Sequence, residues 1–570
     1  CTNLLAFGQR RQYRLLLEIQ NGLSLETGNL SQDIAMSGHP WRGVALVNPV
    51  TILRRALIVL FALLLASEVI LALQWRLLQD APLLHYVAWL ANEHDYVVYR
   101  DIFETSMPGT FLVHMLIGRL FGYGDLAFRL VDLAWLAGLM AVSWLLIRRI
   151  NPVVAWAATL GFAIAYIAYG PGMTMQRDYL GLLPIATAML VAAGSRYGSG
   201  TRAVLVGGLF AAAVTLKPHL GLGLPFVLIY MTVCENEDWK NDYGPALKSL
   251  LRIGLSASAG FLPVLSLPLL WLWSTGGLEA FWEMATLYLP LHVDMTGAIE
   301  TVTPEQHLDY TVRKYIHGIR FYAPPAILGV LITLRFGGLD RDQRRLVYLF
   351  AWLVFAYSIY VVLGGKFWVY HWIPFRYMAT VCTALMLVPL VQLKRRMLIE
   401  STFIILFMAI LIVWVSLWGY VKQTLRFPYS FVHQVSGLPP PPPKNGVVDE
   451  IADFLVAAKL GPDEKVQPLD WTDGAVHAML IAEVLPATRY IYDYYFYHYL
   501  SDPYIQNIRQ EYITGLQANP PRYMIDITNK LKPTGLDTTD TFPELVEIIE
   551  SQYRVAQKGT NYRILERIAD

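Results

Sequence analysis

The sequence predicts a polytopic α-helical membrane protein with a small C-terminal α/β domain. Hydrophobic residues make up 55% of the 570 residues and charged residues only 16%, and the mean hydropathy is +0.41. Ordinary globular domains carry about 25% charged residues. The composition therefore excludes a soluble enzyme and a disordered chain, and the balance of 45 basic against 44 acidic residues excludes a nucleic-acid binder. Long apolar runs and the placement of the basic residues support the same fold class.

The first segment, residues 1–50, is predicted to be cytoplasmic. It lacks the apolar core of a cleavable signal peptide. The chain begins with Cys1, which we interpret as a truncated or mis-started reading frame with Met36 as the candidate start.

The region 51–420 is predicted to be a transmembrane domain. A spanning helix needs about 20 apolar residues, fewer where neighbouring helices shield it. Eleven candidate spans meet this description, at 56–76, 128–147, 152–170, 180–195, 203–216, 219–234, 253–273, 321–335, 346–363, 377–393 and 401–420.

The basic residues set the orientation of these spans. Clusters of Lys and Arg lie before the first predicted span and then in every second connection between spans, at 54–55, 148–149, 196–202, 240–252, 341–345 and 394–396. The positive-inside rule makes that side cytoplasmic. We therefore expect a multi-pass membrane protein with its N-terminus inside and its C-terminal domain outside.

The C-terminal part is predicted to be a linker and an extracytoplasmic domain. Residues 421–444 contain the run Pro439–Pro443, which is typical of a stiff polyproline spacer. Residues 445–570 have an ordinary composition, with predicted helices near 447–459 and 543–551 and strand-like segments near 465–469, 522–527 and 562–565. The aromatic run 490–497 suits stacking on sugars, but packing in a core or an interfacial belt is favoured.

The first outer loop, 77–127, is too apolar for an open loop. Its segments 82–90 and 108–121 are predicted to be juxtamembrane helices, because the second is only about 14 residues long. The loop also holds an acidic cluster, which either forms part of a site or is solvated: Asp80, Glu93, Asp95, Asp101 and Glu104.

This loop resembles the first outer loop of the C-type glycosyltransferases, membrane enzymes that use polyprenyl-phosphate sugars. The resemblance lies in the order of Asp80, a short helix, Asp95–Val98, Ile102–Gly109, Phe121-Gly122 and Arg129. It is closest to the bacterial branch related to protein O-mannosyltransferases, to the aminoarabinose transferase of lipid A and to rhizobial galacturonosyltransferases. The family's Asp-Glu pair is Asp80-Ala81 here, and its Pro-Pro dipeptide is Met107-Pro108.

Three later segments resemble the same family in order. Met175–Tyr179 resembles its second acidic site, Thr215–Pro218 resembles its Thr-Lys-Gly-Pro segment, and Lys366–Pro374 resembles its Tyr-His-x-x-Pro outer loop. The resemblance covers roughly residues 50–395 and implies a transfer of sugar from a polyprenyl-phosphate donor to an acceptor hydroxyl of a lipid, glycan or protein, with inversion.

The resemblance also implies roles for named residues. Asp80 falls on the catalytic acid of the family, with Asp101 as the alternative and Asp178 as the second acid. Glu104 and Pro108 support the loop. The donor phosphate is expected to bind to Lys217, His219, Lys366, Tyr370, His371 and Arg177. Alternatively, each lysine extends its ammonium group to the membrane surface and binds no phosphate. A divalent cation, Mg²⁺ or Mn²⁺, held by Asp80 and Asp178 is an open alternative.

Other interpretations remain at this point. A lipid or glycan transporter would show repeated halves and broken helices at mid-membrane. A non-catalytic relative would explain the altered Asp-Glu and Pro-Pro pairs. The intramembrane acids Glu68 and Asp132 suit either function or interhelical hydrogen bonds, and residues 281–294 suit either a substrate groove or an interfacial belt.

Overall fold

The computed structural model describes residues 49–73, 75–236, 243–391, 448–471, 474–528 and 530–568. The chain divides into two units, Cys1–Leu57 and Ile58–Asp570, and the account below concerns the second. Helix α2 (Pro49–Ala72) begins in the first unit and ends in the second.

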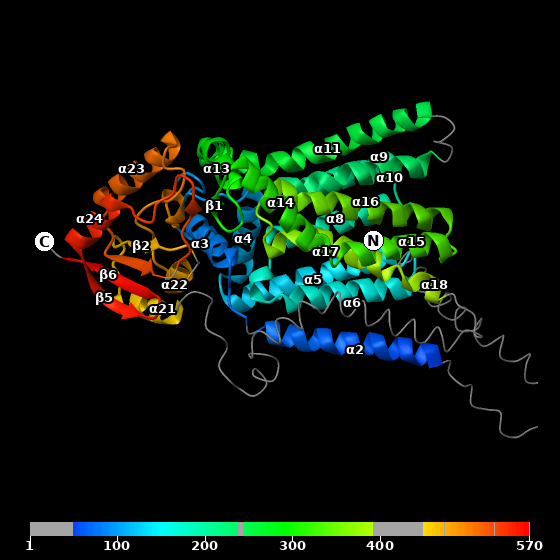
Figure 1. Cartoon of the computed structure of the whole chain (residues 1–570), viewed down its shortest axis with the longest axis horizontal. Helices are drawn as coiled ribbons and strands as arrows, with labels where there is room; N and C mark the ends of the chain where they lie inside the picture. The colour runs from blue at the N-terminus through cyan, green and yellow to red at the C-terminus, as the bar shows by residue number, and fades with distance from the viewer. Residues whose placement is uncertain are drawn as a thin grey trace, which may run out of the picture. The chain divides into compact units, whose positions relative to one another are not determined.

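The second unit is dominated by apolar helices that run side by side (Figure 1). All predicted spans except the last coincide with helices, whereas 401–420, the linker 421–444 and residues 1–48 lie outside the described residues. Six of the described helical segments are long and apolar enough to cross a membrane, and α14 with α15, bent by 52°, would make a seventh. The helices of this part are α5 (Asp125–Ile147), α6 (Pro152–Ala168), α8 (Leu182–Ala192), α9 (Ser199–Leu216), α10 (Leu224–Glu235), α11 (Tyr243–Thr275), α14 (Pro304–Ile319), α15 (Ala323–Phe336), α16 (Arg341–Gly364), α17 (Ile373–Ala384) and α18 (Leu387–Val391).

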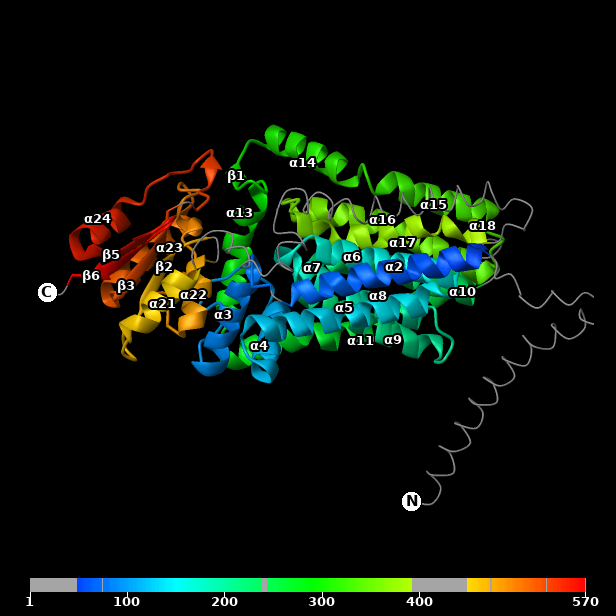
Figure 2. The same ribbon diagram turned by 90° about the horizontal axis from the view of Figure 1, so that it is seen from below.

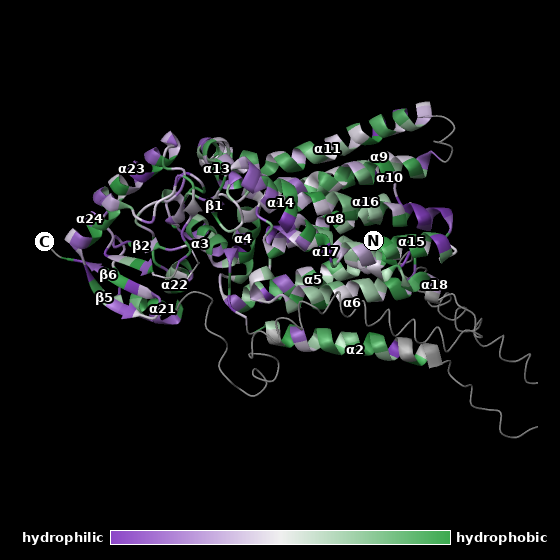
Figure 3. Cartoon of the chain, viewed as in Figure 1, coloured by the Kyte–Doolittle hydropathy of each residue, from purple (hydrophilic) through white to green (hydrophobic). Residues whose placement is uncertain are grey.

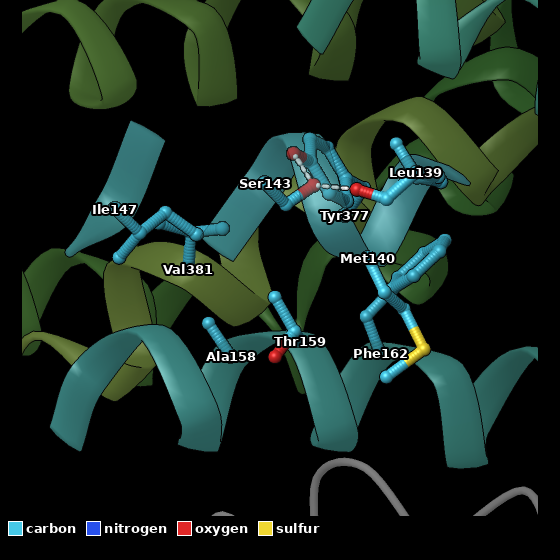
Figure 4. A pocket seen from close by; sticks show the side chains of 9 residues that line it. All are labelled: Leu139, Met140, Ser143, Ile147, Ala158, Thr159, Phe162, Tyr377 and Val381. Carbon is cyan, nitrogen blue, oxygen red and sulfur yellow. Dashed lines mark hydrogen bonds between the residues drawn. The ribbon is translucent and has the colours of Figure 1, made fainter. Parts of the chain in front are cut away.

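Hydrophobic residues predominate along these helices (Figure 3), and many of them are exposed, as expected for a lipid-facing surface. Leu255 on α11 is 74% exposed and Leu331 on α15 is 57% exposed. Between α5, α6 and α17 lies an apolar pocket in which polar groups satisfy one another (Figure 4). The Ser143 hydroxyl lies 2.6 Å from the Leu139 carbonyl and 2.7 Å from the Tyr377 hydroxyl. These bonds avoid the cost of unpaired polar groups within the membrane.

Helices α9 and α11 pack with their backbones in contact, because glycines lie at the crossing. A Cβ atom on Gly260 would lie 1.9 Å from the Val204 carbonyl oxygen, and one on Gly207 would lie 1.9 Å from that of Ala257. Small residues at such crossings allow close approach of membrane helices.

We expect Gly260→Val to lower the midpoint of thermal unfolding, because the new side chain would push α9 away. Overpacking typically costs about 1–3 kcal/mol. The matched control is Gly254→Val on the same helix, where a Cβ atom meets nothing within 4 Å. Equal losses in the two variants would mean that helix propensity, and not the crossing, sets the effect.

Two juxtamembrane helices follow α2, as predicted. They are α3 (Asp80–Glu93) and α4 (Pro108–Phe121), and they pack against each other. Pro108 occupies the first turn of α4, where its missing N–H costs nothing. The intervening residues place the acidic loop between the two helices.

The C-terminal part contains the predicted helices and strands and further elements that were not predicted. Its four-stranded sheet has the order β2-β3-β6-β5, with β2 parallel to β3 and the other pairs antiparallel. Its elements are α21 (Val448–Ala458), β2 (Val466–Leu469), α22 (Gly474–Ala482), η6 (Tyr494–Phe496), α23 (Pro503–Ala518), β3 (Tyr523–Ile527), β4 (Thr534–Gly535), α24 (Pro543–Gln552), β5 (Tyr553–Gly559) and β6 (Tyr562–Arg567).

This C-terminal part packs directly on the first outer loop, as α22 and α3 show in two views (Figures 1 and 2). The Tyr86 hydroxyl donates to the Val484 carbonyl at 2.7 Å, and the Phe103 amide donates to the Arg489 carbonyl at 2.8 Å. Strand β1 (Glu300–Thr301) pairs in parallel with β4. The domain is therefore joined to the loops beside it by backbone hydrogen bonds.

Candidate functional site

Arg177 joins two segments of the first outer loop. It begins the short helix α7 (Arg177–Leu180), after the loop that follows α6. Its Nη2 lies 2.7 Å from Asp80 Oδ2 at the start of α3, and its Nη1 donates to Ser106 Oγ at 2.7 Å. Burial alone would lower the pKa of Arg177, but the carboxylates of Asp80 and Glu104 help to raise it above its ordinary value. The guanidinium therefore stays charged and fixes Asp80.

A second ion pair lies next to the first along α7. Lys217 caps the C-terminal end of α9, and its Nζ lies 3.0 Å and 3.2 Å from the two carboxylate oxygens of Asp178. The Tyr360 hydroxyl donates to the same carboxylate, and the Lys217 ammonium lies 5.2 Å from the centre of the Tyr360 ring. The Asp178 side chain is fully buried, so it orients Lys217 and is not itself open to solvent.

The predicted loop-support residues position the loop between α3 and α4. Glu104 is buried and accepts the Ser106 amide at 2.5 Å. Burial raises the pKa of Glu104, while Arg177 opposes the rise. Pro108 starts α4, and a Cβ atom on the next residue, Gly109, would lie 2.4 Å from Thr215 Oγ1. This contact brings the Met107-Pro108 segment onto the Thr215–Pro218 segment.

The ion pairs of Arg177 with Asp80 and of Lys217 with Asp178 form a cluster around Arg177. Residues of the 3₁₀ helix η4 (Val369–Trp372) lie beside this cluster. Tyr370 and His371 are buried and their rings lie 4.7 Å apart. His219, in η2 (Pro218–Gly223), lies edge-on to the Tyr360 ring at 6.0 Å. The Nδ1 atoms of His219 and His371 have no hydrogen-bond partner among the described residues.

Lys366 has a different environment from Lys217. Its ammonium donates to the carbonyls of His292 and Met295, the second at 2.6 Å. Burial lowers its pKa to about 7. Since two carbonyls accept its hydrogen bonds, Lys366 holds the C-terminal end of α13 (Leu289–Asp294), and Lys217 is the better placed cation for a phosphate.

The structure does not bring Asp101 to this cluster. Its carboxylate accepts the Val97 amide at 2.8 Å and pairs with Arg100 at 2.8 Å, which closes a turn. Of the two candidate catalytic acids, Asp80 is the one that lies beside Arg177.

The arrangement of Asp80 and Asp178 does not fit a divalent cation. Each carboxylate already faces a basic side chain, Arg177 and Lys217 respectively. No group of three or more His, Cys, Asp or Glu side chains with a metal-binding arrangement occurs in the described parts of the chain. We therefore assign no step to a metal.

Several residues beside the cluster were not predicted. Ser106 and Tyr360 were missed because single hydroxyl residues carry no pattern. Tyr494 belongs to the aromatic run, which is buried and packs in the core, as the favoured interpretation had it. Its hydroxyl lies 3.5 Å from His292 Nδ1, and burial together with the nearby charges of Glu104 and Asp80 raises its pKa. The C-terminal part thus supplies a tyrosine close to Asp80.

Other intramembrane candidates have structural partners. Asp132 accepts the Tyr166 hydroxyl at 2.6 Å and lies 3.9 Å from Arg129, which supports the interhelical interpretation. Glu68 is buried on α2. In residues 281–294, Met284 and Tyr288 of the π-helical turn η3 (Met284–Tyr288) are buried, while Trp282 is 53% exposed.

Comparison with known proteins identifies the fold. No protein-family model matches the chain, and no curated protein matches its sequence. The crystal structure of ArnT from Cupriavidus metallidurans bound to undecaprenyl phosphate matches with a TM-score of 0.53 over 90% of this chain and 98% of that chain, at 12% identity. The chain has the C-type glycosyltransferase fold.

Further C-type structures match less closely. The apo oligosaccharyltransferase of Archaeoglobus fulgidus has a TM-score of 0.45 at 13% identity, covering 83% of this chain and 69% of that chain. ArnT in the apo state has a TM-score of 0.37 at 12% identity, covering 90% and 98%. The match to ArnT bound to undecaprenyl phosphate confirms the C-type fold predicted from the order of the sequence motifs, and the cluster around Arg177 is the candidate active site.

Proposed function

We propose that this protein is a membrane glycosyltransferase that moves a sugar from a polyprenyl-phosphate donor to an acceptor hydroxyl. One observation carries the proposal. Arg177 and Asp178 are neighbours on α7. Arg177 pairs with Asp80, and Asp178 pairs with Lys217. Each pair joins segments that resemble motifs of the C-type enzymes. A transporter would need no such pairing of a partly exposed acid with fixed cations.

The donor phosphate would bind beside Lys217. The ammonium has a fixed direction, because Asp178 holds it, and its side chain is 15% exposed. His219 and His371 have free Nδ1 atoms among the described residues and supply further hydrogen bonds to phosphate oxygens. Hydrogen bonds between charged groups in a site with little water are about twice as strong as neutral ones.

Asp80 would act as the general base. Its side chain is 29% exposed, so an acceptor hydroxyl can reach it, and Arg177 orients the carboxylate. As the carboxylate takes the hydroxyl proton, the acceptor oxygen forms a bond to the anomeric carbon. The bond from that carbon to the phosphate oxygen breaks, and polyprenyl phosphate leaves with the electron pair. A single displacement of this kind inverts the anomeric centre.

The acceptor is proposed to be a lipid, a glycan or a protein. Purified protein should be incubated with a panel of polyprenyl-phosphate sugars and simple acceptors. We expect one donor to release polyprenyl phosphate with formation of a glycoside of opposite anomeric configuration, as seen by NMR. Movement of lipid across proteoliposomes with every donor left intact would instead support the transporter interpretation.

The site is proposed to lie on the outer face of a bacterial inner membrane. In a cysteine-free background, a cysteine at Ser551 on α24 should react with a membrane-impermeant maleimide added to intact cells. A cysteine at Asp342, which is 85% exposed at the start of α16, should react only after lysis. The reverse pattern would overturn the orientation and place the site in the cytoplasm.

A further inference from the structure

Arg376 on α17 takes no part in the two ion pairs at α7 and has unusual partners. Its guanidinium carbon lies 4.7 Å from the centre of the Tyr169 ring and 5.4 Å from that of Tyr322. The hydroxyls of these two tyrosines are 3.2 Å apart. Tyr169 ends α6 and Tyr322 precedes α15, so three separate segments hold the guanidinium at one place.

Two of the three side-chain nitrogens of Arg376 have no hydrogen-bond partner in the described parts of the chain. Its Nε and Nη1 atoms are buried and have no hydrogen-bond partner among the described residues. No described acidic side chain forms an ion pair with it. A guanidinium carries five N–H donors and cannot lose its charge, and unpaired cations are costly within a membrane domain. Aromatic rings attract the cation but accept none of these hydrogen bonds in the manner of an anion.

This arginine is half-buried, and the segment beside it is exposed. It lies at the bend between α14 and α15, where Arg320 and Phe321 are exposed and the Arg320 guanidinium lies 4.5 Å from the Phe321 ring centre. Arg320 likewise has no ion pair with an acid among the described residues.

Helix α14 leads to this bend with an apolar stripe that the protein leaves uncovered. Leu308, Val312 and Ile316 recur at every fourth position and are 65%, 47% and 56% exposed. No residue of α14 is buried. The stripe is followed on α15 by Ile327 and Leu328, which are also exposed, as on a lipid-facing helix. An amphipathic helix of this kind lies in the interface plane of a bilayer.

The bend is also close to the candidate active site. Gly318 on α14 packs on Trp372, since a Cβ atom there would lie 1.9 Å from the indole ring. Trp372 directly follows His371 and ends η4. The bend and the Arg177 cluster are therefore at the same end of the helical bundle.

We propose that the bend between α14 and α15 binds the phosphate of an anionic lipid headgroup from the leaflet beside the active site, with Arg376 and Arg320 as the cations. Tyr169 and Tyr322 orient Arg376, and the stripe of α14 lies on the acyl chains. The chemistry recognised is a phosphate diester held at the interface. Since lipid binding is measured without turnover, this inference stands or fails independently of the proposed glycosyl transfer.

The test is binding of phosphatidylglycerol to the purified full chain, followed by native mass spectrometry, with phosphatidylcholine as the zwitterionic comparison. We expect a preference for phosphatidylglycerol and a loss of about tenfold in its apparent affinity in Arg376→Gln, as for a lost charge-assisted contact. Arg376→Lys should recover part of the affinity. The matched control is Arg335→Gln, because Arg335 also lies beside a ring, at 5.2 Å from Phe336, at the other end of α15. It should retain wild-type affinity.

Each other outcome would overturn the inference. Equal binding of both lipids, or wild-type affinity in Arg376→Gln, would return Arg376 to a purely structural role. Full competition by inorganic phosphate would indicate a site for free phosphate and no lipid site. If Arg376→Gln fails to fold, Arg320→Gln decides, since we expect it to weaken phosphatidylglycerol binding about threefold and unchanged affinity would contradict the proposal.

Discussion

Turnover of the Asp80→Asn variant is expected to fall by about 10²–10⁴-fold, while binding of the polyprenyl-phosphate sugar stays near normal. The amide keeps the shape of the carboxylate and can still accept a hydrogen bond from Arg177, which lies 2.7 Å from it. It cannot take a proton from the acceptor hydroxyl. The measurement is single-turnover release of polyprenyl phosphate beside a direct titration of donor binding.

The control for this experiment is Asp101→Asn. Asp101 belongs to the same acidic cluster in the sequence, but it closes a turn and pairs with Arg100. We expect it to retain nearly full turnover. If the Asp101 variant is inactive and the Asp80 variant is active, Asp101, in the loop after α3, is the general base. Full activity in both variants would leave the acidic loop without a catalytic role.

Donor affinity of the Lys217→Met variant is expected to fall by roughly ten- to a hundredfold. Loss of a hydrogen bond to a charged group typically costs about 1.5–3 kcal/mol. The same change also removes the cation beside Asp178, whose side chain is fully buried. Breaking a buried pair by removing one partner costs about 3–5 kcal/mol of stability. Both the donor titration and the thermal midpoint should therefore change.

A double variant separates these two effects. Adding Asp178→Asn to Lys217→Met removes the unpaired buried charge, while the Tyr360 hydroxyl retains an acceptor. We expect the thermal midpoint to recover towards that of the wild type and the donor affinity to stay low. Recovery of both would mean that Lys217 serves the fold alone and that the donor phosphate binds elsewhere.

Much of the helical architecture could be predicted because helices depend on local features, namely apolar runs and the residues at their ends. The juxtamembrane helix 108–121 was predicted with the bounds that α4 has, since Pro108 starts it and Gly122 ends it. The number of spans was harder to predict. Several helices are short and buried by their neighbours, as α8 is, so length and apolarity alone do not show which of them cross the membrane.

The sequence predicts which segments form the candidate site, but not which of their residues pair with one another. The motif order pointed to Asp80, Asp178 and Lys217, yet nothing local says that Asp80 pairs with a residue 97 positions away. The choice between Asp80 and Asp101 depended on how the loop closes, which the Val97 amide and Arg100 decide. Tyr494 could not be assigned, because its place depends on how the C-terminal domain packs on the first loop.

That packing has a consequence for how the protein is made. The hydrogen bond from Tyr86 to Val484 joins residues 398 positions apart. The Phe103 amide likewise donates to the carbonyl of Arg489, far along the chain. At a synthesis rate of about 5–20 residues per second, the first loop emerges about 20–80 s before its partner. During that interval the loop lacks the C-terminal carbonyls to which Tyr86 and Phe103 donate. The first loop can therefore reach its final packing only after the C-terminal part has been synthesised, and a chain released early from the ribosome lacks these contacts.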